Sequence, residues 1–399
     1  MKNRYLCANT LPRHMKTLLF KLYILLSVAI LLQSCQQRDR YVVFSGYAQG
    51  GTWAVKANMK GVKVRDAQVK AQLDSILVRI DRSLSGYNRN SILSAFNAGR
   101  TVMPDSLFLD IYERAVAVYD VTGGCVDVAA APLYDIWGFG FKSGEMPSDA
   151  LVSKTLSECG MARLRRDMGE ALASDGSLSP ASFLLNSSNS QSDSMRLQAG
   201  SSHRSQKLMS VPYASQSSHT VSGALPQLNY NAIAQGYSCD VVAEYLYSIG
   251  VKDMMVDIGE IYCDGLNPSG NRWTIGIDSP VDGNNNPGEN LQAIFRVPEG
   301  PHGVVTSGNY RKFYVKDGKK YAHTVDPRTG YPVSHSLLSA TILAPDATLA
   351  DAYATYCMVL GLEESQVFIL SQPEVEGCLI YDNGGNFQIW TSPGFQLSE

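Results

Sequence analysis

The spacing of apolar and polar positions changes several times along the chain, and each change predicts a new structural element. Residues 41–58 alternate between apolar and polar positions around Gly50-Gly51, which is typical of two paired strands. Residues 66–82 and 105–120 instead place apolar side chains three and four positions apart, the pattern of helices that bury one face. This part of the chain therefore predicts a strand pair followed by amphipathic helices.

The rest of the chain continues to alternate between strands and helices. A helix is predicted within "NAIAQGYSCDVVAEYLYSIG", ending at Gly250, and strands are predicted in "VKDMMVDIG" and "RWTIGIDSP". Residues 303–327 predict two strands joined by Asp317-Gly318, a dipeptide typical of tight hairpins. "ATLADAYATYCMVLG" predicts a further helix of small residues. This order lacks the regular rhythm of a doubly wound sheet, so the predicted class is α+β with mixed sheets and packed helices.

Residues 165–222 interrupt the pattern. Ser and Gln dominate there, hydrophobic periodicity is lost, and "NSSNSQSDS" is low in complexity. Such a composition buries too little apolar area to offset the entropy of ordering the chain. We predict that about residues 175–220 form a disordered surface insertion.

The N-terminus carries the features of an export signal. Lys16 and Lys21 precede an almost wholly apolar stretch, residues 22–32, and "LQSC" then ends at Cys35. This ending resembles a bacterial lipobox, so residues 1–35 are interpreted as a signal peptide, Cys35 as its lipidated residue, and the protein as an exported lipoprotein anchored on the periplasmic side. The alternative is an uncleaved N-terminal membrane anchor. We expect Met15 to be a better start than Met1, with residues 1–14 as an over-extended N-terminus.

Bulk composition excludes some classes of function without choosing one. The 399 residues carry a net charge of −3, so no basic excess points to nucleic acid. The eight cysteines form no C-x2-C pair of the zinc type. An exported protein permits disulfides, but the spacing of these cysteines pairs none of them, and buried thiols are the alternative.

The segment "AHTVDPRTGYPVS", residues 322–334, concentrates charged groups at a tight turn. Pro327 fixes φ at the second position of the turn and Gly330 accepts a positive φ. His323, Asp326 and Arg328 then lie where a strand enters the turn. They form either a solvated hairpin end or a small polar site held rigid by Pro and Gly.

Asp351 and Thr355 lie four positions apart on a predicted helix, which places both side-chain oxygens on one face. A carboxylate and a neutral oxygen, completed by phosphate or water oxygens, suit Mg²⁺. The alternative is that Asp351 only favours the first turn of a helix and Thr355 is a small packed residue. Spacing alone favours this alternative.

Four loops are ambiguous when each is taken alone. The turn "NAIAQG" before a helix offers backbone N–H groups to an anion and carbonyls to a metal, yet an ordinary tight turn would look the same. "VVTSGNYRKF" supplies hydroxyls and N–H groups suited to phosphate, or simply flanks a hairpin. The "DIG" at 257–259 and "GGCVDVAAAPL" at 123–133 are typical turn sequences.

Taken in order, the motifs are far more specific than any one of them. They are "AQGGTWAV", "LSGYNRNSILSAFN", "GGCVDVAAAPLYDIWGFG", "NAIAQGYSCDVVAEYL", "VDIGEIYCDG", "WTIGIDSP", "VVTSGNYRKFY", "AHTVDPRTGYPV" and "ADAYATYCMVLG". In this order the chain resembles the ApbE family, the FAD:protein FMN transferases. The resemblance covers about residues 41–392 as a single domain, apart from the Ser-rich insertion.

The resemblance implies both a fold and a reaction. Family members are exported, often lipid-anchored, and have an α+β fold related to the tunnelling fold. They bind FAD and Mg²⁺, cleave the pyrophosphate, pass FMN to a Thr or Ser hydroxyl of an acceptor protein and release AMP. The acceptors resemble flavin-carrying subunits of sodium-pumping and electron-transfer membrane complexes.

The resemblance also assigns roles by position. The metal ligands would be Asp351 and Thr355 through their side chains and Ala232 through its carbonyl. The flavin and adenine pockets would be lined by Gln49, Tyr87, Cys125, Val126, Asp127, Asn229, Gln235, Ser307, Gly308 and Val325.

Three positions depart from the family pattern. Asn229 and Gln235 stand where the family usually has Asp and Lys, and Glu260 stands where a second Gly often follows. The loss of the Lys removes a cation from beside the phosphates, but Asn and Gln still form hydrogen bonds.

His323 is the candidate general base for the acceptor hydroxyl, which is a poor nucleophile at neutral pH. Asp326 would orient His323 or contact the nucleotide, and Arg328 would hold the turn or face phosphate. Two alternatives remain open: a hydrolase that splits FAD into FMN and AMP, and a non-catalytic flavin-binding lipoprotein, which Asn229 and Gln235 favour. A purely structural surface lipoprotein would not need these ordered polar motifs.

Overall fold

The computed structural model describes residue 21 and residues 39–398, except 101, 143–145, 166–226, 285–287, 311–312 and 317–318. Apart from residue 21, the predicted signal peptide lies outside these residues, as do Cys35, the predicted insertion at about 175–220 and the Asp317-Gly318 turn. Among the described residues, no helix combines the length and the apolar character needed to cross a membrane.

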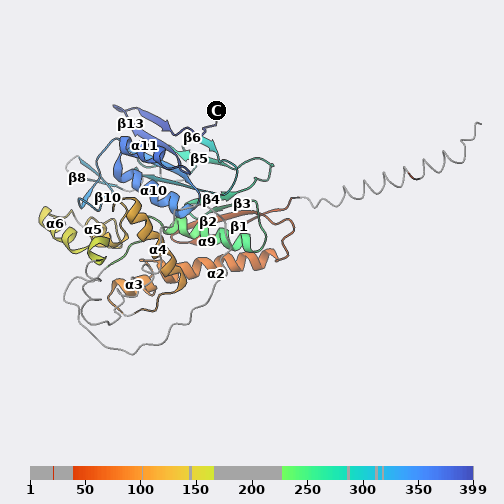
Figure 1. The fold of residues 1–399 in the computed structure, drawn as a ribbon, viewed down its shortest axis with the longest axis horizontal. Helices are drawn as coiled ribbons and strands as arrows, with labels where there is room; N and C mark the ends of the chain where they lie inside the picture. The colour runs from red at the N-terminus through yellow and green to blue at the C-terminus, as the bar shows by residue number, and fades with distance from the viewer. Residues whose placement is uncertain are drawn as a thin grey trace, which may run out of the picture.

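An eight-stranded antiparallel sheet organises the fold (Figure 1), in the order β1-β2-β3-β4-β7-β12-β13-β14. Its strands are β1 Tyr41–Ala48, β2 Gly51–Asn58, β3 Met254–Asp257, β4 Ile261–Asp264, β7 His302–Gly308, β12 Leu337–Ala344, β13 Glu376–Asp382 and β14 Phe387–Thr391. Three two-stranded sheets accompany it: β5 Thr274–Asp278 with β6 Leu291–Arg296, β8 Phe313–Lys316 with β9 Lys319–Ala322, and β10 Val325–Asp326 with β11 Tyr331–Pro332.

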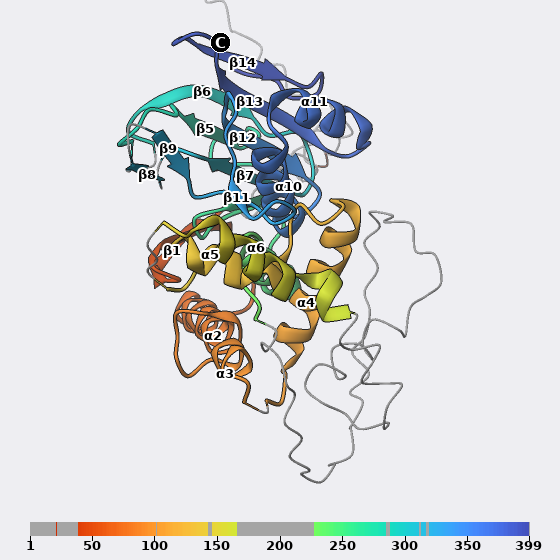
Figure 2. The same cartoon turned by 90° about the vertical axis from the view of Figure 1, so that its left-hand side faces the viewer.

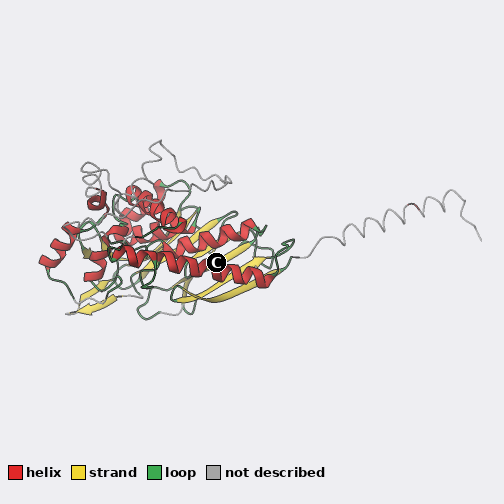
Figure 3. Cartoon of the chain, turned by 90° about the horizontal axis from the view of Figure 1, so that it is seen from below, coloured by secondary structure: helices red, strands yellow, loops and turns green. Residues whose placement is uncertain are grey.

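Helices gather on one side of the large sheet (Figure 3). They are α2 Asp66–Leu84, α3 Ile92–Asn97, α4 Ser106–Val121, the 3-10 turn η1 Val128–Ala130, α5 Ala131–Ile136, α6 Asp149–Glu158, α9 Ala234–Ser248, α10 Ala347–Leu360 and α11 Leu362–Ser371. Figure 2 shows α2 and α3 at one end of the molecule and β5, β6, β13 and β14 at the other.

The period-two alternation of the strands divides the sheet into two apolar faces. Val305, Ile342 and Leu379 point into the main core with the buried faces of α2, α4, α9 and α10. Their sequence neighbours Val304 and Leu343 point the other way, into a second core with the β5–β6 hairpin. The large sheet is therefore covered by helices on one face and by a hairpin on the other.

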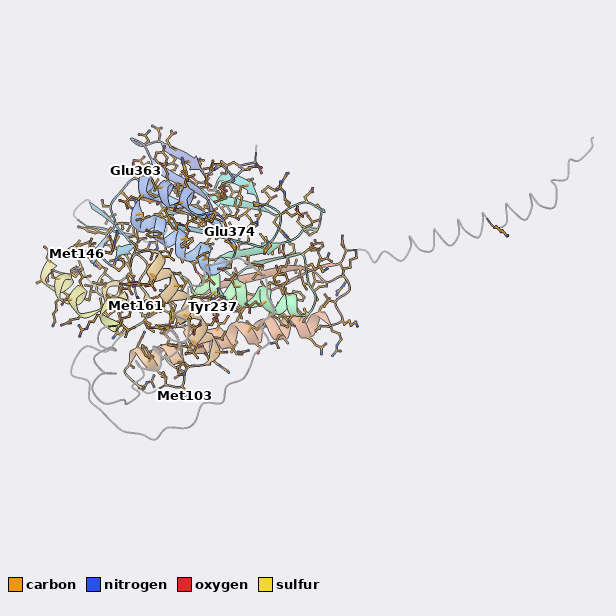
Figure 4. The ribbon with its side chains drawn as sticks, in the orientation of Figure 1. Met103, Met146, Met161, Tyr237, Glu363 and Glu374 are labelled. Carbon is orange, nitrogen blue, oxygen red and sulfur yellow. The ribbon has the colours of Figure 1, made fainter. Side chains whose placement is uncertain are left out.

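Residues without bulky side chains allow α10 to lie close against the sheet and against α9. An added Cβ at Gly303 of β7 would lie 2.3 Å from Ala347 Cα at the start of α10. Tyr237, labelled in Figure 4, is fully buried on α9, and the guanidinium of Arg114 lies 5.7 Å from its ring centroid. These contacts join α4, α9 and α10 into one layer.

The predicted α+β class is confirmed, whereas the expectation of mixed sheets is wrong. All pairings among the described strands are antiparallel. Hydrophobic periodicity reports which face a residue occupies and carries no information on strand direction, which explains the difference. The helices predicted at 66–82 and 105–120 correspond to α2 and α4. The six described cysteines from Cys125 onward are free thiols, five of them buried.

We expect Gly303→Ala to destabilise the protein by about 1–3 kcal/mol or more, because backbone atoms of α10 occupy the space of the new methyl group. Urea unfolding measures the change. Gly51→Ala is the matched control in the same sheet, because nothing lies within 4 Å of its added Cβ, and it should unfold like the wild type. Equal stability of the two variants would contradict the close packing of β7 against α10.

Candidate functional site

The centre of the candidate site is the contact between the first turns of α9 and α10. The N–H of Gly236 donates to Asp351 Oδ2 over 3.1 Å, although the two residues are 115 positions apart. Asp351 is 5% exposed, and the turn containing Ala232 immediately precedes α9. The structure thus brings the "NAIAQG" turn and the Asp351–Thr355 face of α10 together.

The carboxyl group of Asp351 has a raised pKa. Burial is the main cause, the nearby carboxylate of Asp240 adds to it, and the hydrogen bond from Gly236 opposes it. A cation would remove the cost of burying this charge, so the position favours a metal ligand.

The donor set around Asp351 limits which metal would fit. Among the described residues, no three His, Cys, Asp or Glu side chains converge to form a cage. The predicted ligands, one carboxylate, the Thr355 hydroxyl one turn later and the Ala232 carbonyl, would make a sparse oxygen set. Such a set suits Mg²⁺, which keeps water or phosphate oxygens in its shell.

Several candidate pocket residues surround the first turn of α9. Gln49 donates through Nε2 to Ser238 Oγ over 2.5 Å, and Ser238 donates in turn to the Ala234 carbonyl over 2.7 Å. Tyr87 accepts through its hydroxyl from Asn231 Nδ2 over 3.1 Å, and its side chain is 66% exposed.

Asn229, one of the departures from the family pattern, is buried and shapes this turn. Its Oδ1 accepts from the N–H of Asn231 over 2.9 Å, and its own N–H donates to the Val128 carbonyl over 2.8 Å. Asn229 therefore joins the loop around residues 125–127 to the turn before α9.

Gln235 reaches the "DIG" loop rather than standing alone. Its Nε2 donates to the Ile258 carbonyl over 3.3 Å, and an added Cβ at Gly259 would lie 2.5 Å from the same nitrogen. Gly259 has a φ of +92°, which favours glycine. The carboxamide is thus held against the loop whose next residue, Glu260, also departs from the family pattern.

The residues predicted between 125 and 127 are buried and closely bonded. Asp127 accepts from the N–H groups of Ala129 over 2.8 Å and of Met161, labelled in Figure 4, over 2.9 Å. Burial raises the pKa of Asp127 despite these donors, and burial also raises the pKa of Cys125 to about 11. Asp127 caps the 3-10 turn, so its side chain has a structural task here.

The end of β7 is joined to the segment that carries His323. An added Cβ at Gly308 would lie 2.5 Å from the ring of Tyr310, so this position excludes larger residues. Asn309, one residue beyond the strand, accepts through Oδ1 from Thr324 Oγ1 over 2.9 Å. The end of β7, with Ser307 and Gly308, thereby lies beside the segment that carries His323.

The β10–β11 turn is anchored on two sides. Gly330, with φ +83°, donates to the Asp326 carbonyl over 2.8 Å and accepts from Trp137 Nε1 over 2.8 Å. Val325 is buried beside Trp137 and Val152. The predicted tight turn is confirmed, and it is held rigid by α5 and α6.

The carboxylate of Asp326 is engaged by Arg328. Oδ1 accepts from the backbone N–H and the Nε of Arg328, and Oδ2 accepts from Nη2 over 2.9 Å. This arrangement fits Arg328 as the residue that holds the turn. Phe139 contacts His323 edge-on, with ring centroids 6.4 Å apart, and stacks on Tyr314.

Sequence reasoning missed Asp240, Asn231 and Phe139. Phe139 lies within the quoted "WGFG" and Asn231 opens the quoted "NAIAQG" turn, but one aromatic or amide among many carries no signal of a contact. Asp240 reads as an ordinary residue of an amphipathic helix. Only the approach of α9 to α10 gives it a special position.

Comparison with known proteins identifies close likenesses over almost the whole chain. The ApbE family model matches residues 50–379. The FAD:protein FMN transferase of Escherichia coli K12 is 27% identical over 93% of this chain and 95% of its own length. That of Vibrio cholerae is 27% identical over 93% of this chain and 96% of its own length.

Solved structures agree with these sequence matches. The flavin transferase ApbE from Vibrio cholerae superposes with a TM-score of 0.65 at 25% identity, covering 89% of this chain and 98% of its own. The flavinyl transferase ApbE of Pseudomonas stutzeri, in its apo form, gives a TM-score of 0.67 at 25% identity, covering 89% and 95%.

We expect the buried carboxyl group of Asp351 to contribute stability to the metal-free protein that is lost as the pH rises above about 4, where an ordinary Asp ionises. The raised pKa of Asp351 means that the folded state binds its proton more tightly than the unfolded state, so this contribution is present at low pH and lost as pH rises. Thermal unfolding in EDTA across pH 4–8 measures it, and Asp351→Asn should flatten the dependence. An unchanged slope in the variant would contradict the burial argument.

Proposed function

This chain belongs to the ApbE family, and we propose that it is an FAD:protein FMN transferase that uses Mg²⁺ and releases AMP. Within the site, the proposal is carried by the hydrogen bond between Gly236 and Asp351. That contact gathers a helix N-terminus, a buried carboxylate and the "NAIAQG" turn at one point, as binding of a nucleotide pyrophosphate with a cation requires.

In this proposal Asp351, Thr355 and the Ala232 carbonyl hold Mg²⁺. The bound ion would neutralise charge on the pyrophosphate and so help AMP to leave. The buried, metal-accepting environment of Asp351 supports this assignment. The N-terminus of α9 adds a favourable helix dipole for the phosphates.

His323 is proposed to take the proton from the acceptor Thr or Ser hydroxyl as its oxygen attacks the phosphorus of the FMN half of FAD. The new bond joins this oxygen to phosphorus, and the bond from phosphorus to the AMP oxygen breaks. The anchored β10–β11 turn, the Thr324–Asn309 hydrogen bond and the Phe139 contact support a fixed imidazole position. Asp326 then acts through the turn, because Arg328 engages its carboxylate.

The remaining pocket residues are proposed to hold the flavin and adenine groups of FAD. They are Gln49, Tyr87, Cys125, Val126, Asp127, Asn229, Gln235, Ser307, Gly308 and Val325. The gathering of Gln49, Tyr87 and Asn229 at the first turn of α9 supports a shared pocket. Gln235 offers a neutral carboxamide rather than a cation, so phosphate binding depends more strongly on Mg²⁺ in this chain.

We further propose that the protein acts as a lipoprotein bound through Cys35 to a membrane on its periplasmic side. The export-type N-terminus supports this location. The acceptor would then be a flavin-carrying subunit of a sodium-pumping or electron-transfer membrane complex. Hydrolysis of FAD to FMN and AMP is the competing outcome in the assay below.

The direct test is intact-mass measurement of a candidate acceptor domain incubated with FAD, Mg²⁺ and the chain from residue 36. We expect the acceptor to gain the mass of one FMN, to gain nothing with EDTA, and to recover when excess Mg²⁺ is added. Asp351→Ala should lower the rate by at least about 100-fold, because it removes the carboxylate ligand. If FMN and AMP are released while acceptors of several kinds stay unmodified, the chain is instead a hydrolase.

His323→Gln should lower the rate of flavin transfer by about 10²–10⁴-fold, the range typical of a lost general base, while FAD binding stays near the wild-type value. Fluorescence quenching of FAD measures binding separately from transfer. Phe139→Leu, which keeps an apolar side chain beside an intact imidazole, is the matched control and should lose much less. Transfer by His323→Gln at the wild-type rate would remove His323 from the mechanism.

A further inference from the structure

The helices α9 and α10 cap one another. Asp351 of α10 accepts from the N–H of Gly236 in the first turn of α9. In return, Asp240 of α9 accepts from the N–H groups of Ala347 and Thr348, which open α10, over 2.8 and 2.9 Å. In both helices the carboxylate follows the capped N–H by four residues, 236 to 240 and 347 to 351, so the exchange is nearly symmetrical.

This exchange requires the two first turns to touch. An added Cβ at Gly236 would lie 2.1 Å from the Ala347 carbonyl oxygen. A residue larger than glycine would therefore push the helices apart and stretch both sets of hydrogen bonds. The two helix N-termini are held at one distance by hydrogen bonds and by contact.

Two carboxylates cap α10, one from the residue before the helix and one from the neighbouring helix α9. Asp346 is the local cap and accepts through Oδ1 from the N–H of Leu349 over 2.7 Å. Asp240 caps from the neighbouring helix and also accepts from the Thr348 hydroxyl. The N–H of Ala350 donates to the Asp346 carbonyl over 3.1 Å, so the first four N–H groups of α10 all have acceptors. Of the two capping carboxylates, only Asp240 comes from α9.

The burial of the two caps differs as well. Asp240 is 7% exposed, whereas the side chain of Asp346 is 39% exposed and lies 3.9 Å from Arg114. Burying a carboxylate as deeply as Asp240 is costly, and the three donors from α10 offset part of that cost. The same hydrogen bonds thus hold both the Asp240 side chain and the start of α10 in position.

We propose that Asp240 is the positioning residue of the metal site, holding α10 so that Asp351 presents its carboxylate to the cation. This inference rests on the proposed function, in which Asp351 is a metal ligand. Gly236 donates to Oδ2 of Asp351, and this hydrogen bond would orient the carboxylate that holds the cation. The hydrogen bonds of Asp240 fix the position of the start of α10 relative to α9. Asp240 thereby keeps Asp351 within hydrogen-bonding distance of Gly236.

The test compares Asp240→Asn with Asp346→Asn. Both variants remove a charged cap of α10, but only Asp240→Asn alters a hydrogen-bonded link between α10 and α9. Mg²⁺ affinity is measured by calorimetry on the FAD-loaded chain from residue 36. We expect Asp240→Asn to raise the Kd for Mg²⁺ by about 10–100-fold, the usual range for a residue that orients a metal ligand. Asp346→Asn should change it by less than about twofold.

A second readout separates positioning from general damage. Saturating Mg²⁺ should restore most of the kcat of Asp240→Asn, because the ligand itself is intact, whereas a misfolded enzyme would not recover. In metal-free protein, the amide of Gly236 should exchange faster in Asp240→Asn than in Asp346→Asn. Thr348→Val removes one hydrogen-bond donor to Asp240 and leaves the carboxylate of Asp240 in place, so it should weaken Mg²⁺ binding by about 2–5-fold. This variant replaces Asp240→Asn in the test if Asp240→Asn does not fold.

The outcomes distinguish this inference from the proposed function. The positioning role alone would be overturned if Asp240→Asn and Thr348→Val bind Mg²⁺ as well as the wild-type protein does. Equal weakening by Asp240→Asn and Asp346→Asn would also overturn it, because any cap of α10 would then suffice. Wild-type protein that binds FAD but no Mg²⁺ would overturn the metal assignment and this inference with it.

Discussion

The candidate site depends on one contact, the meeting of the N-termini of α9 and α10. Asp351 caps α9 through Gly236, and Asp240 caps α10 through Ala347 and Thr348. Two helices that are far apart in the sequence thereby behave as one rigid support. The helix dipoles, the backbone N–H groups and the buried carboxylate all lie where these first turns converge, so chemistry and structural support share the same atoms.

Small residues make this convergence possible. Gly236 and Gly303 both approach Ala347 more closely than a side chain would allow, and α10 is rich in alanine along its buried face. Bulky residues would bury more apolar area here but would separate the helices and the sheet. The packing therefore gives up some hydrophobic burial for the short distances on which the capping hydrogen bonds depend.

The second part of the site is held by a different kind of constraint. The turn that follows His323 is fixed by the Asp326–Arg328 pair, by the Trp137–Gly330 hydrogen bond and by buried Val325. Thr324 joins it to Asn309 at the end of β7, and β7 also passes the start of α10 at Gly303. The segment that carries His323 and the start of α10 thus both contact β7, which favours a constant geometry between them.

The sequence by itself determined the elements, the α+β class, the tight turn at Gly330 and the family resemblance, because periodicity, turn residues and motif order are local properties. Its four-residue spacing put Asp351 and Thr355 on one helix face, but only the family resemblance assigned the two residues to a metal. Only the tertiary structure decided that every strand pairing is antiparallel, that Arg328 engages Asp326, and that Asp240 faces the start of α10. Strand direction and contacts between distant helices follow from how the whole chain packs, and no local pattern encodes them.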